Sequence, residues 1–193
     1  MKPLKIAVTG THSTGKSTFV GALKTALESL GLRVGAVHDS AARAQDLGFP
    51  ILSQHTFEST AWLIAEAIRM EAEESLVSDV ILVDRPVPDA LGYLLAALRH
   101  TRRTLEPERY ERLEAQCRAW IGEYDLIFVT ELDPAVPVGA GRDDDADFRI
   151  LAGEAIREII DEMAPSKLVL RHGRTDEAID ICIATARRKQ LIT

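Results

Sequence analysis

The sequence predicts an α/β fold, in which a five-stranded parallel sheet is covered by helices on both faces. Short apolar runs alternate along the chain with longer segments of helical periodicity, and this alternation is typical of βαβ units. The run from Val80 to Val83 is apolar at every position, as expected of a strand buried on both faces of a parallel sheet. A chain of 193 residues suffices for one such domain and is too short for two ordinary ones, so we expect a single domain over residues 1–193.

A glycine-rich loop follows the first predicted strand, Leu4 to Thr9. The loop fits the pattern G-x-x-x-x-G-K-[ST], and helical periodicity follows it up to Leu30, which is the context that a phosphate-binding loop requires. Its glycines let backbone N–H groups converge on phosphate oxygens at a helix N-terminus. Lys16 adds a positive charge for the β- and γ-phosphates, and the Ser17 hydroxyl is placed to ligate Mg²⁺. The predicted phosphate-binding residues are Gly10, Thr11, His12, Ser13, Thr14, Gly15, Lys16, Ser17 and Thr18.

The next segments predict a short strand and a long helix. Gly31 is a plausible stop for the helix that follows the loop, because glycine favours the left-handed conformation of helix ends. Val34 to His38 is typical of a second short strand. Ser53 or Thr56 can then cap a long amphipathic helix that continues to Leu76.

The middle of the chain predicts two strands and two helices. Asp84 ends the apolar strand 80–83, and the following segment, 90–98, is apolar almost all round, which predicts a helix that passes through the core. Pro107 fits the first turn of a further helix, and 125–129 is the fourth predicted strand.

The last part of the chain begins with a segment, 134–141, that is too rich in proline and glycine to be regular. A predicted helix then runs through Met163 until Pro165 ends it. The fifth predicted strand covers 167–171, and Thr175 can cap the closing helix.

Composition and charge narrow the partners that the chain can have. The formal net charge of -7 argues against a nucleic-acid partner, because an acidic surface repels a phosphate backbone. No apolar run reaches the roughly 18 residues of a membrane span, and no basic and then apolar leader opens the sequence. We therefore expect a cytoplasmic protein with no membrane partner, and a homo-oligomer is possible. Cys117 and Cys182 lack the spacing of a zinc or redox motif, which favours buried thiols.

Four predicted strand ends carry residues suited to one cleft, because ligands of parallel sheets bind beyond the carboxyl ends of the strands. These residues are Gly10, Asp39, Asp84 and Glu131. An acid in the position of Asp84 normally completes the Mg²⁺ shell, directly or through a water, or takes a proton from the acceptor. Ser17 and Asp84 are therefore the predicted metal ligands.

Several residues could line the side of the cleft where a phosphoryl acceptor would bind, and each of them has two interpretations. Asp39 is the second candidate for the catalytic base, and Arg43, four residues on, could share its helical face as a plain ion pair or contact the substrate. Arg85 could hold an acceptor or a phosphate, or it could pair with a neighbouring acid. Asp89 could cap the apolar helix or accept a hydrogen bond from a substrate hydroxyl.

Two arginines mark a predicted lid at about 134–150. Arg142 and Arg149 are seven residues apart, which places them on one side of a helix. In phosphoryl transfer such arginines neutralise charge on the transferred group, and a closing lid excludes water. We count both as catalytic candidates, beside Lys16, Asp39 and Asp84. The four aspartates between them could pair with the lid arginines when no nucleotide is bound.

These motifs together resemble the P-loop small-molecule kinases. The residues that carry the resemblance are the G-x-x-x-T-G-K-S-T loop, the run D-R-x-x-x-D-x-x-x-Y formed by Asp84, Arg85, Asp89 and Tyr93, and the arginine-bearing lid. The chain is most similar to ribosylnicotinamide-kinase-like proteins, which are often labelled AAA-type or predicted ATPases, and more distantly to deoxynucleoside and nucleotide kinases. The relatives tend to have Glu three residues before their counterpart of Arg43, where this chain has Ser40.

The resemblance implies a P-loop NTPase fold that uses ATP and Mg²⁺ and transfers a phosphoryl group to a small-molecule acceptor. It also implies an acceptor site lined by Asp39, Arg43, Arg85 and Asp89, with the lid arginines around the γ-phosphate. We predict a kinase that acts on a hydroxyl of a nucleoside-like or other metabolite.

A regulatory NTPase without such an acceptor is the alternative. A GTPase switch is a weaker version of this alternative. Asp89 begins a match to the D-x-x-G motif, but the aspartate of that motif should directly end its strand, and the residue that ends the strand here is Asp84. A single-stranded nucleic-acid kinase is disfavoured by the acidic charge and by an aromatic content of 5%.

Overall fold

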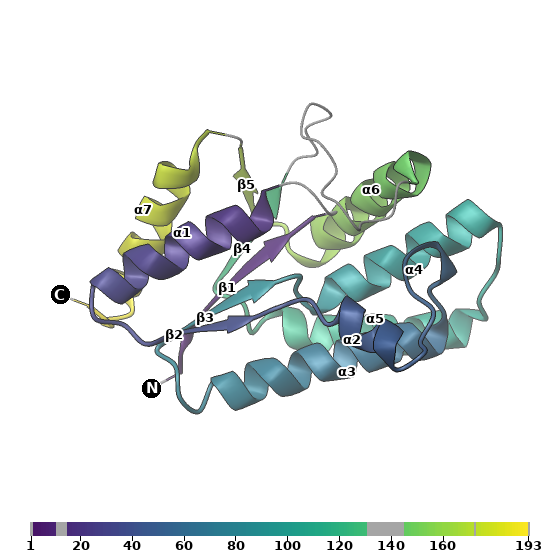
Figure 1. Cartoon of the computed structure of the whole chain (residues 1–193), viewed down its shortest axis with the longest axis horizontal. Coiled ribbons are helices and arrows are strands. Elements are labelled where there is room, and N and C mark those ends of the chain that lie inside the picture. The colour runs from purple at the N-terminus through teal and green to yellow at the C-terminus, as the bar shows by residue number, and fades with distance from the viewer. Residues whose placement is uncertain (1, 11–14, 131–144, 172, 193) are drawn as a thin grey trace.

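A five-stranded sheet forms the middle of the molecule (Figure 1), with strand order β2-β3-β1-β4-β5. All four strand pairings among the described residues are parallel, as predicted. The structure is a computed structural model that describes residues 2–10, 15–130, 145–171 and 173–192. The strands are β1 (Leu4–Thr9), β2 (Val34–Val37), β3 (Val80–Asp84), β4 (Leu126–Thr130) and β5 (Leu168–Leu170).

Helices connect the strands in the right order for βαβ units. The α-helices are α1 (Lys16–Ser29), α2 (Ala41–Asp46), α3 (Phe57–Glu74), α4 (Val87–Thr101), α5 (Pro107–Ile121), α6 (Ala146–Met163) and α7 (Thr175–Arg188), with a 3₁₀ turn, η1, at Leu52–Gln54. None of these helices combines the length and the apolarity that crossing a membrane requires.

Successive side chains of the strands point to opposite faces of the sheet, and each face packs in its own apolar layer. One layer joins residues such as Ile6 and Leu82 to α1 and α7, and the other joins residues such as Ala7 and Val83 to α4 and α6. Figure 1 shows α1 and α7 on one side of the sheet and α3, α4 and α5 on the other. The sheet is therefore buried on both faces, which explains why β3 is apolar until its last residue.

Helix α4 lies in the core, as its apolar sequence predicted. Its residues pack on the sheet and also contact α3, α5 and α6. Gly92 lets α6 approach closely, because a Cβ at this position would lie 2.8 Å from the Cα of Ile156 and 3.1 Å from its backbone nitrogen. Helices α4 and α6 therefore form a closely packed pair.

A buried ionic network ties β1, α3 and α5 to the start of α4. Lys5 Nζ and Trp120 Nε1 donate to Glu71 Oε2 over 3.2 and 2.8 Å, and the Tyr124 hydroxyl donates to Glu71 Oε1 over 2.7 Å. The same hydroxyl accepts a hydrogen bond of 3.1 Å from the backbone nitrogen of Val87. Glu71 has no exposed surface, and all these donors satisfy its charge, as a buried carboxylate requires.

Several element ends differ from the prediction or decide between alternatives. Thr56, and not Ser53, caps α3, in a reciprocal pair with Ser59. Helix α4 starts at Val87, earlier than expected. The prediction that Thr175 caps α7 was wrong, because Thr175 is the first helical residue and the residue before it makes no side-chain cap.

The C-terminal ends of the central strands meet at one edge of the sheet. In the parallel register Val8 of β1 lies opposite Asp84 of β3, and the Arg85 backbone nitrogen donates to Val8 O over 3.1 Å. The phosphate loop and the Asp84–Asp89 segment therefore start side by side, as ligand sites of parallel sheets do.

Candidate active site

The described part of the phosphate loop has the backbone that the motif needs. Gly10 has φ 130° and Gly15 has φ 83°. Residues other than glycine rarely adopt these positive φ values. A Cβ on Gly10 would also meet Thr130 Oγ1 at 2.2 Å. Gly15 caps α1 without a side-chain hydrogen bond, so the first N–H groups of the helix suit an anion. Thr11, His12, Ser13 and Thr14 lie outside the described residues.

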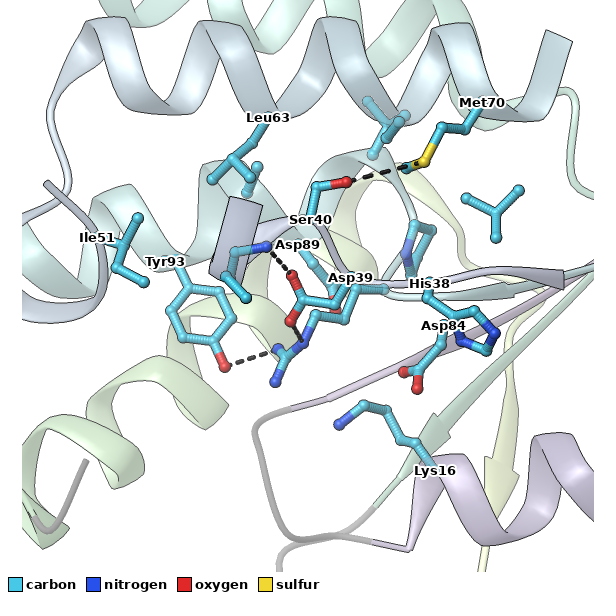
Figure 2. A pocket seen from close by; sticks show the side chains of 18 of the residues that line it. Lys16, His38, Asp39, Ser40, Ile51, Leu63, Met70, Asp84, Asp89 and Tyr93 are labelled. Atoms are coloured by element: carbon cyan, nitrogen blue, oxygen red, sulfur yellow. Dashed lines mark hydrogen bonds and ion pairs between the residues drawn. The ribbon is translucent and has the colours of Figure 1, made fainter. Parts of the chain in front are cut away.

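Lys16 is the first residue of α1 and lines a cavity of about 490 Å³. Its side chain reaches into that cavity on the side where the Asp84 carboxylate lies (Figure 2). Burial lowers the pKa of Lys16, and the positive charge of Arg85 lowers it further, while Asp84, Asp89 and Asp39 raise it. The positive charge of Lys16 is thus poorly solvated, a state that a phosphate anion would relieve.

Ser17 and Asp84 lie together at the phosphate end of this cavity. The Ser17 hydroxyl donates to Asp84 Oδ2 over 3.0 Å. Asp84 Oδ1 is buried and has no hydrogen-bond partner among the described residues, which is costly for a carboxylate oxygen. A hydroxyl and an under-satisfied carboxylate side by side are hard oxygen donors that fit Mg²⁺. The two residues could therefore hold the metal that the sequence predicted for them.

Arg85 also lines the cavity and contacts three groups around it. Its Nε lies 2.6 Å from Asp39 Oδ2, and its Nη1 donates to the Tyr93 hydroxyl over 2.6 Å and to Gly10 O over 3.4 Å. Burial opposes its charge, but Tyr93 and the carboxylates around it raise its pKa above the ordinary value. Arg85 also has φ 72°, a strained conformation for a non-glycine residue that is common at functional sites.

Asp39 has both carboxylate oxygens engaged. Oδ2 pairs with Arg85, and Oδ1 accepts a hydrogen bond of 2.7 Å from the backbone nitrogen of Ala41. The alternative in which Asp39 pairs with Arg43 was wrong, because Arg43 pairs instead with Glu66 of α3. The side chain of Arg43 is 62% exposed, and Arg43 is not one of the described residues that line the cavity.

Asp89 lies in the first turn of α4 and is 2% exposed. It accepts a hydrogen bond from Thr9 Oγ1 and does not cap the helix, whose cap position is Pro86. Burial raises the pKa of Asp89 despite the charges of Arg85 and Lys16 nearby. The carboxylate thus links α4 to the end of β1, directly before the phosphate loop.

The far end of the cavity is apolar. Six of the described residues that line it are Val37, Ile51, Leu52, Leu63, Ala67 and Met70. Figure 2 shows Leu63 and Met70 above Asp39, and Lys16 and Asp84 at the opposite end. The cavity therefore joins a charged end, where the sequence predicts phosphate binding, to a more apolar end.

This combination of fold and loop has known counterparts. The chain matches the AAA domain family over residues 5–177. It belongs to the AAA domain family. A search of curated proteins gave no match.

Solved structures with the same fold as this AAA domain include a NadR protein in complex with NR, with a TM-score of 0.68 and 18% identity over 92% of this chain and 50% of that chain. A thymidylate kinase from Candida albicans has a TM-score of 0.66 and 14% identity, over 98% of this chain and 93% of that chain. A thymidylate kinase from Ehrlichia chaffeensis has a TM-score of 0.61 and 14% identity, over 89% of this chain and 88% of that chain. The chain spans about half the length of the NadR chains that it matches. The predicted P-loop kinase-like fold is confirmed.

The predicted lid lies only partly within the described residues of the AAA domain. Arg142 is outside them. Arg149 is in the first turn of α6 and is 8% exposed, and the neighbouring Phe148 is fully buried in the layer shared with α4. Asp145 caps α6 by accepting from the backbone nitrogen of Phe148 over 2.8 Å, and it pairs with His100 over 3.1 Å. Arg149 therefore belongs to a helix that is packed against the core.

Sequence reasoning missed two residues that line the cavity of this AAA domain, Tyr93 and His55. Tyr93 was part of the motif but had no role, and His55 was not singled out. The two rings stack, with centroids 5.6 Å apart and planes at 22°, and both line the cavity. The position of Tyr93 in the second turn of α4, which starts two residues after Arg85, could have indicated Tyr93, whereas nothing around His55 forms a recognisable motif.

Proposed function

We propose that this AAA domain is an ATP- and Mg²⁺-dependent kinase that transfers the γ-phosphoryl group to a hydroxyl of a small nucleoside-like or other metabolite. One observation carries the proposal: a single cavity of about 490 Å³ is lined at one end by Lys16, Ser17 and Asp84 and continues beyond Arg85 into an apolar end. A purely regulatory nucleotide site needs the first end alone.

The chain's own residues supply positioning and charge, which account for most of the catalysis in phosphoryl transfer. Lys16 and the N-terminus of α1 bind the phosphates, and Ser17 and Asp84 hold Mg²⁺. When bound, the metal neutralises charge on the β- and γ-phosphate oxygens. The acceptor oxygen forms a bond to the γ-phosphorus, the bond from that phosphorus to the bridging oxygen breaks, and ADP leaves.

Asp84 is the better candidate for receiving the hydroxyl proton, through Oδ1, because Oδ2, which accepts from Ser17, is the oxygen on the metal side. Both oxygens of Asp39 are already engaged, by Arg85 and by the Ala41 N–H, and Asp84 Oδ1 has no partner among the described residues. In this proposal Asp39 holds Arg85 in place, and Arg85 faces the acceptor.

The similar structures support a kinase with a small acceptor. The NadR structures are of complexes with NR, and with NAD and AMP-PNP, and the other two are thymidylate kinases. These ligands and activities belong to those proteins; what this chain shares with them is the fold.

The experiment that tests the proposal measures ADP release from ATP and Mg²⁺, alone and with nucleosides, nucleoside monophosphates, NR and sugars. We expect one compound class to stimulate release, and the Lys16→Ala variant to lose it. Lys24→Ala is the matched control, because Lys24 lies on the same helix with a side chain 41% exposed, and it should keep full activity. Release that no compound stimulates, but that Lys16→Ala abolishes, would favour the regulatory NTPase instead.

A further inference from the structure

His55 is a buried polar residue of the cavity with no role in the mechanism above. It is 4% exposed and lies at the end of η1, just before the cap of α3. It lines the cavity beside Leu52 and Tyr93. A buried imidazole needs hydrogen-bond partners for its nitrogens, so the state of each ring nitrogen matters.

One ring nitrogen is committed to the backbone. His55 Nδ1 lies 2.8 Å from Leu52 O, and because a carbonyl oxygen can only accept, Nδ1 must carry the hydrogen. The ring stacks on Tyr93. Arg103 fixes the segment from outside by donating to His55 O over 3.0 Å and to Ser53 O over 3.2 Å. The position and tilt of the imidazole are therefore set before any ligand binds.

The ring is neutral at physiological pH. Burial lowers the pKa of His55 to about 4, and Arg85 and Arg103 act in the same direction, against the contributions of Leu52 O and Asp39. A neutral imidazole with its hydrogen on Nδ1 has a lone pair on Nε2. Nε2 can then accept a hydrogen bond but cannot donate one.

Nε2 has no hydrogen-bond partner among the described residues, since the Nδ1 bond is the only one that the ring makes there. Two fully enclosed side-chain atoms of the described residues lack a partner, Asp84 Oδ1 and Asp89 Oδ2. Nε2 is not one of them, so it is not fully enclosed, and the cavity is the space that His55 lines.

We propose that His55 determines acceptor specificity, with Nε2 accepting a hydrogen bond from an N–H or O–H group on the part of the acceptor that lies in the apolar end of the cavity. The inference rests on the proposed function. An acceptor without such a donor would bury Nε2 unsatisfied, and sites built around one hydrogen bond discriminate strongly against ligands that lack it. The acceptor class is thus a molecule that carries an N–H or O–H donor on the part that enters the apolar end of the cavity.

The test uses two pairs of nucleosides that differ in one donor: adenosine against purine riboside, which lacks the 6-amino group, and uridine against 3-methyluridine, which lacks N3–H. For at least one pair we expect a KM about tenfold lower for the donor-bearing member, with a similar kcat. His55→Asn should remove this preference, because the asparagine amide can still donate to Leu52 O but has no atom at the Nε2 position. An unchanged preference in His55→Asn would overturn the inference and leave the kinase standing.

A second measurement does not depend on turnover. In protein labelled with ¹⁵N-histidine, the resonances missing from His55→Asn identify His55, and we expect its Nε2 signal to be that of an unprotonated nitrogen. Adenosine or uridine should shift that signal, and purine riboside or 3-methyluridine should not. A protonated Nε2, or equal shifts within both pairs, would overturn the inference. A donor-dependent shift without phosphoryl transfer would support the inference and contradict the kinase, whereas neither binding nor transfer with all four compounds would overturn both the inference and a nucleoside-like acceptor.

Discussion

Arg85 is the residue on which most contacts of the candidate site converge. Its guanidinium contacts an acid from the end of β2, a tyrosine from α4 and the carbonyl of the first loop glycine. A guanidinium has five donors spread over a rigid planar fork and can serve these separated partners at once, whereas the three donors of a lysine leave from a single nitrogen. The nucleotide side and the acceptor side of the cavity therefore share one side chain.

The buried imidazole of His55 predicts that the free energy of unfolding depends on pH. Its pKa is about 4 in the folded protein against an ordinary value of 6.5, so the unfolded chain binds the proton more tightly. The contribution to stability is complete above about pH 6.5 and is lost as the pH falls towards 4, by roughly 3 kcal/mol in total. Urea unfolding between pH 7 and 4.5 measures this loss.

The control for this prediction is His55→Asn, which does not titrate. Its free energy of unfolding should fall less steeply than that of the wild type over the same pH range. Parallel curves for the two proteins would mean that the imidazole is not held neutral by burial.

Among the elements, α4 and α6 are joined most closely, and a glycine permits it. Gly92→Ala would place a methyl group 2.6 Å from Ile156 Cγ1 and 2.8 Å from Ile156 Cα, and the second atom is backbone that cannot turn aside. We expect a loss of about 1–3 kcal/mol in the free energy of unfolding, measured by urea titration.

Gly21→Ala is the matched control for this change. Gly21 also lies within a helix, α1, but a Cβ there meets no atom within 4 Å. Alanine is the better helix former by roughly 1 kcal/mol, so this variant should gain stability. Equal effects of the two substitutions would contradict the close packing of α4 on α6.

The packing of α6 also bears on the predicted lid. Arg149 lies on a helix whose first turn is buried against α4, so within the described residues the C-terminal part of the predicted 134–150 lid is part of the core. The catalytic roles of Arg149 and Arg142 both stay predictions.

At the scale of the whole molecule, the network around Glu71 connects the sheet to the site. It links β1, α3 and α5 with the Tyr124 hydroxyl, which holds the first backbone N–H of α4. Glu71→Ala would leave Lys5 buried without its counter-charge, and we expect a loss of about 3–5 kcal/mol in the free energy of unfolding. Tyr124→Phe, which keeps the packing, should lose about 1–3 kcal/mol.

Glu73→Ala controls for the loss of a carboxylate on the same helix. Its side chain is 63% exposed and pairs with Arg69 at the surface, so its removal should change the free energy of unfolding by at most about 1 kcal/mol. Chemical denaturation of the variants measures each value. A Glu71→Ala variant as stable as Glu73→Ala would show that the network does not support the fold.

The sequence by itself determined the parallel sheet, the alternation of strands and helices along the chain, and the phosphate loop. These features depend on local rules: strand and helix periodicity, the positive φ of Gly10 and Gly15, and a lysine and serine at a helix N-terminus. Asp84 was also placed correctly beside Ser17, because parallel strands bring their carboxyl ends to one edge.

Only the tertiary structure decided which charges pair and which side chains share the cavity. From spacing alone, Asp39 could pair with Arg43 one helical turn away. In the structure Asp39 pairs with Arg85, which follows β3, and Arg43 pairs with Glu66. His55 enters the cavity because α4 brings Tyr93 against a 3₁₀ turn 38 residues earlier in the chain. Contacts between distant segments depend on how the elements pack, and no periodicity in the sequence encodes them.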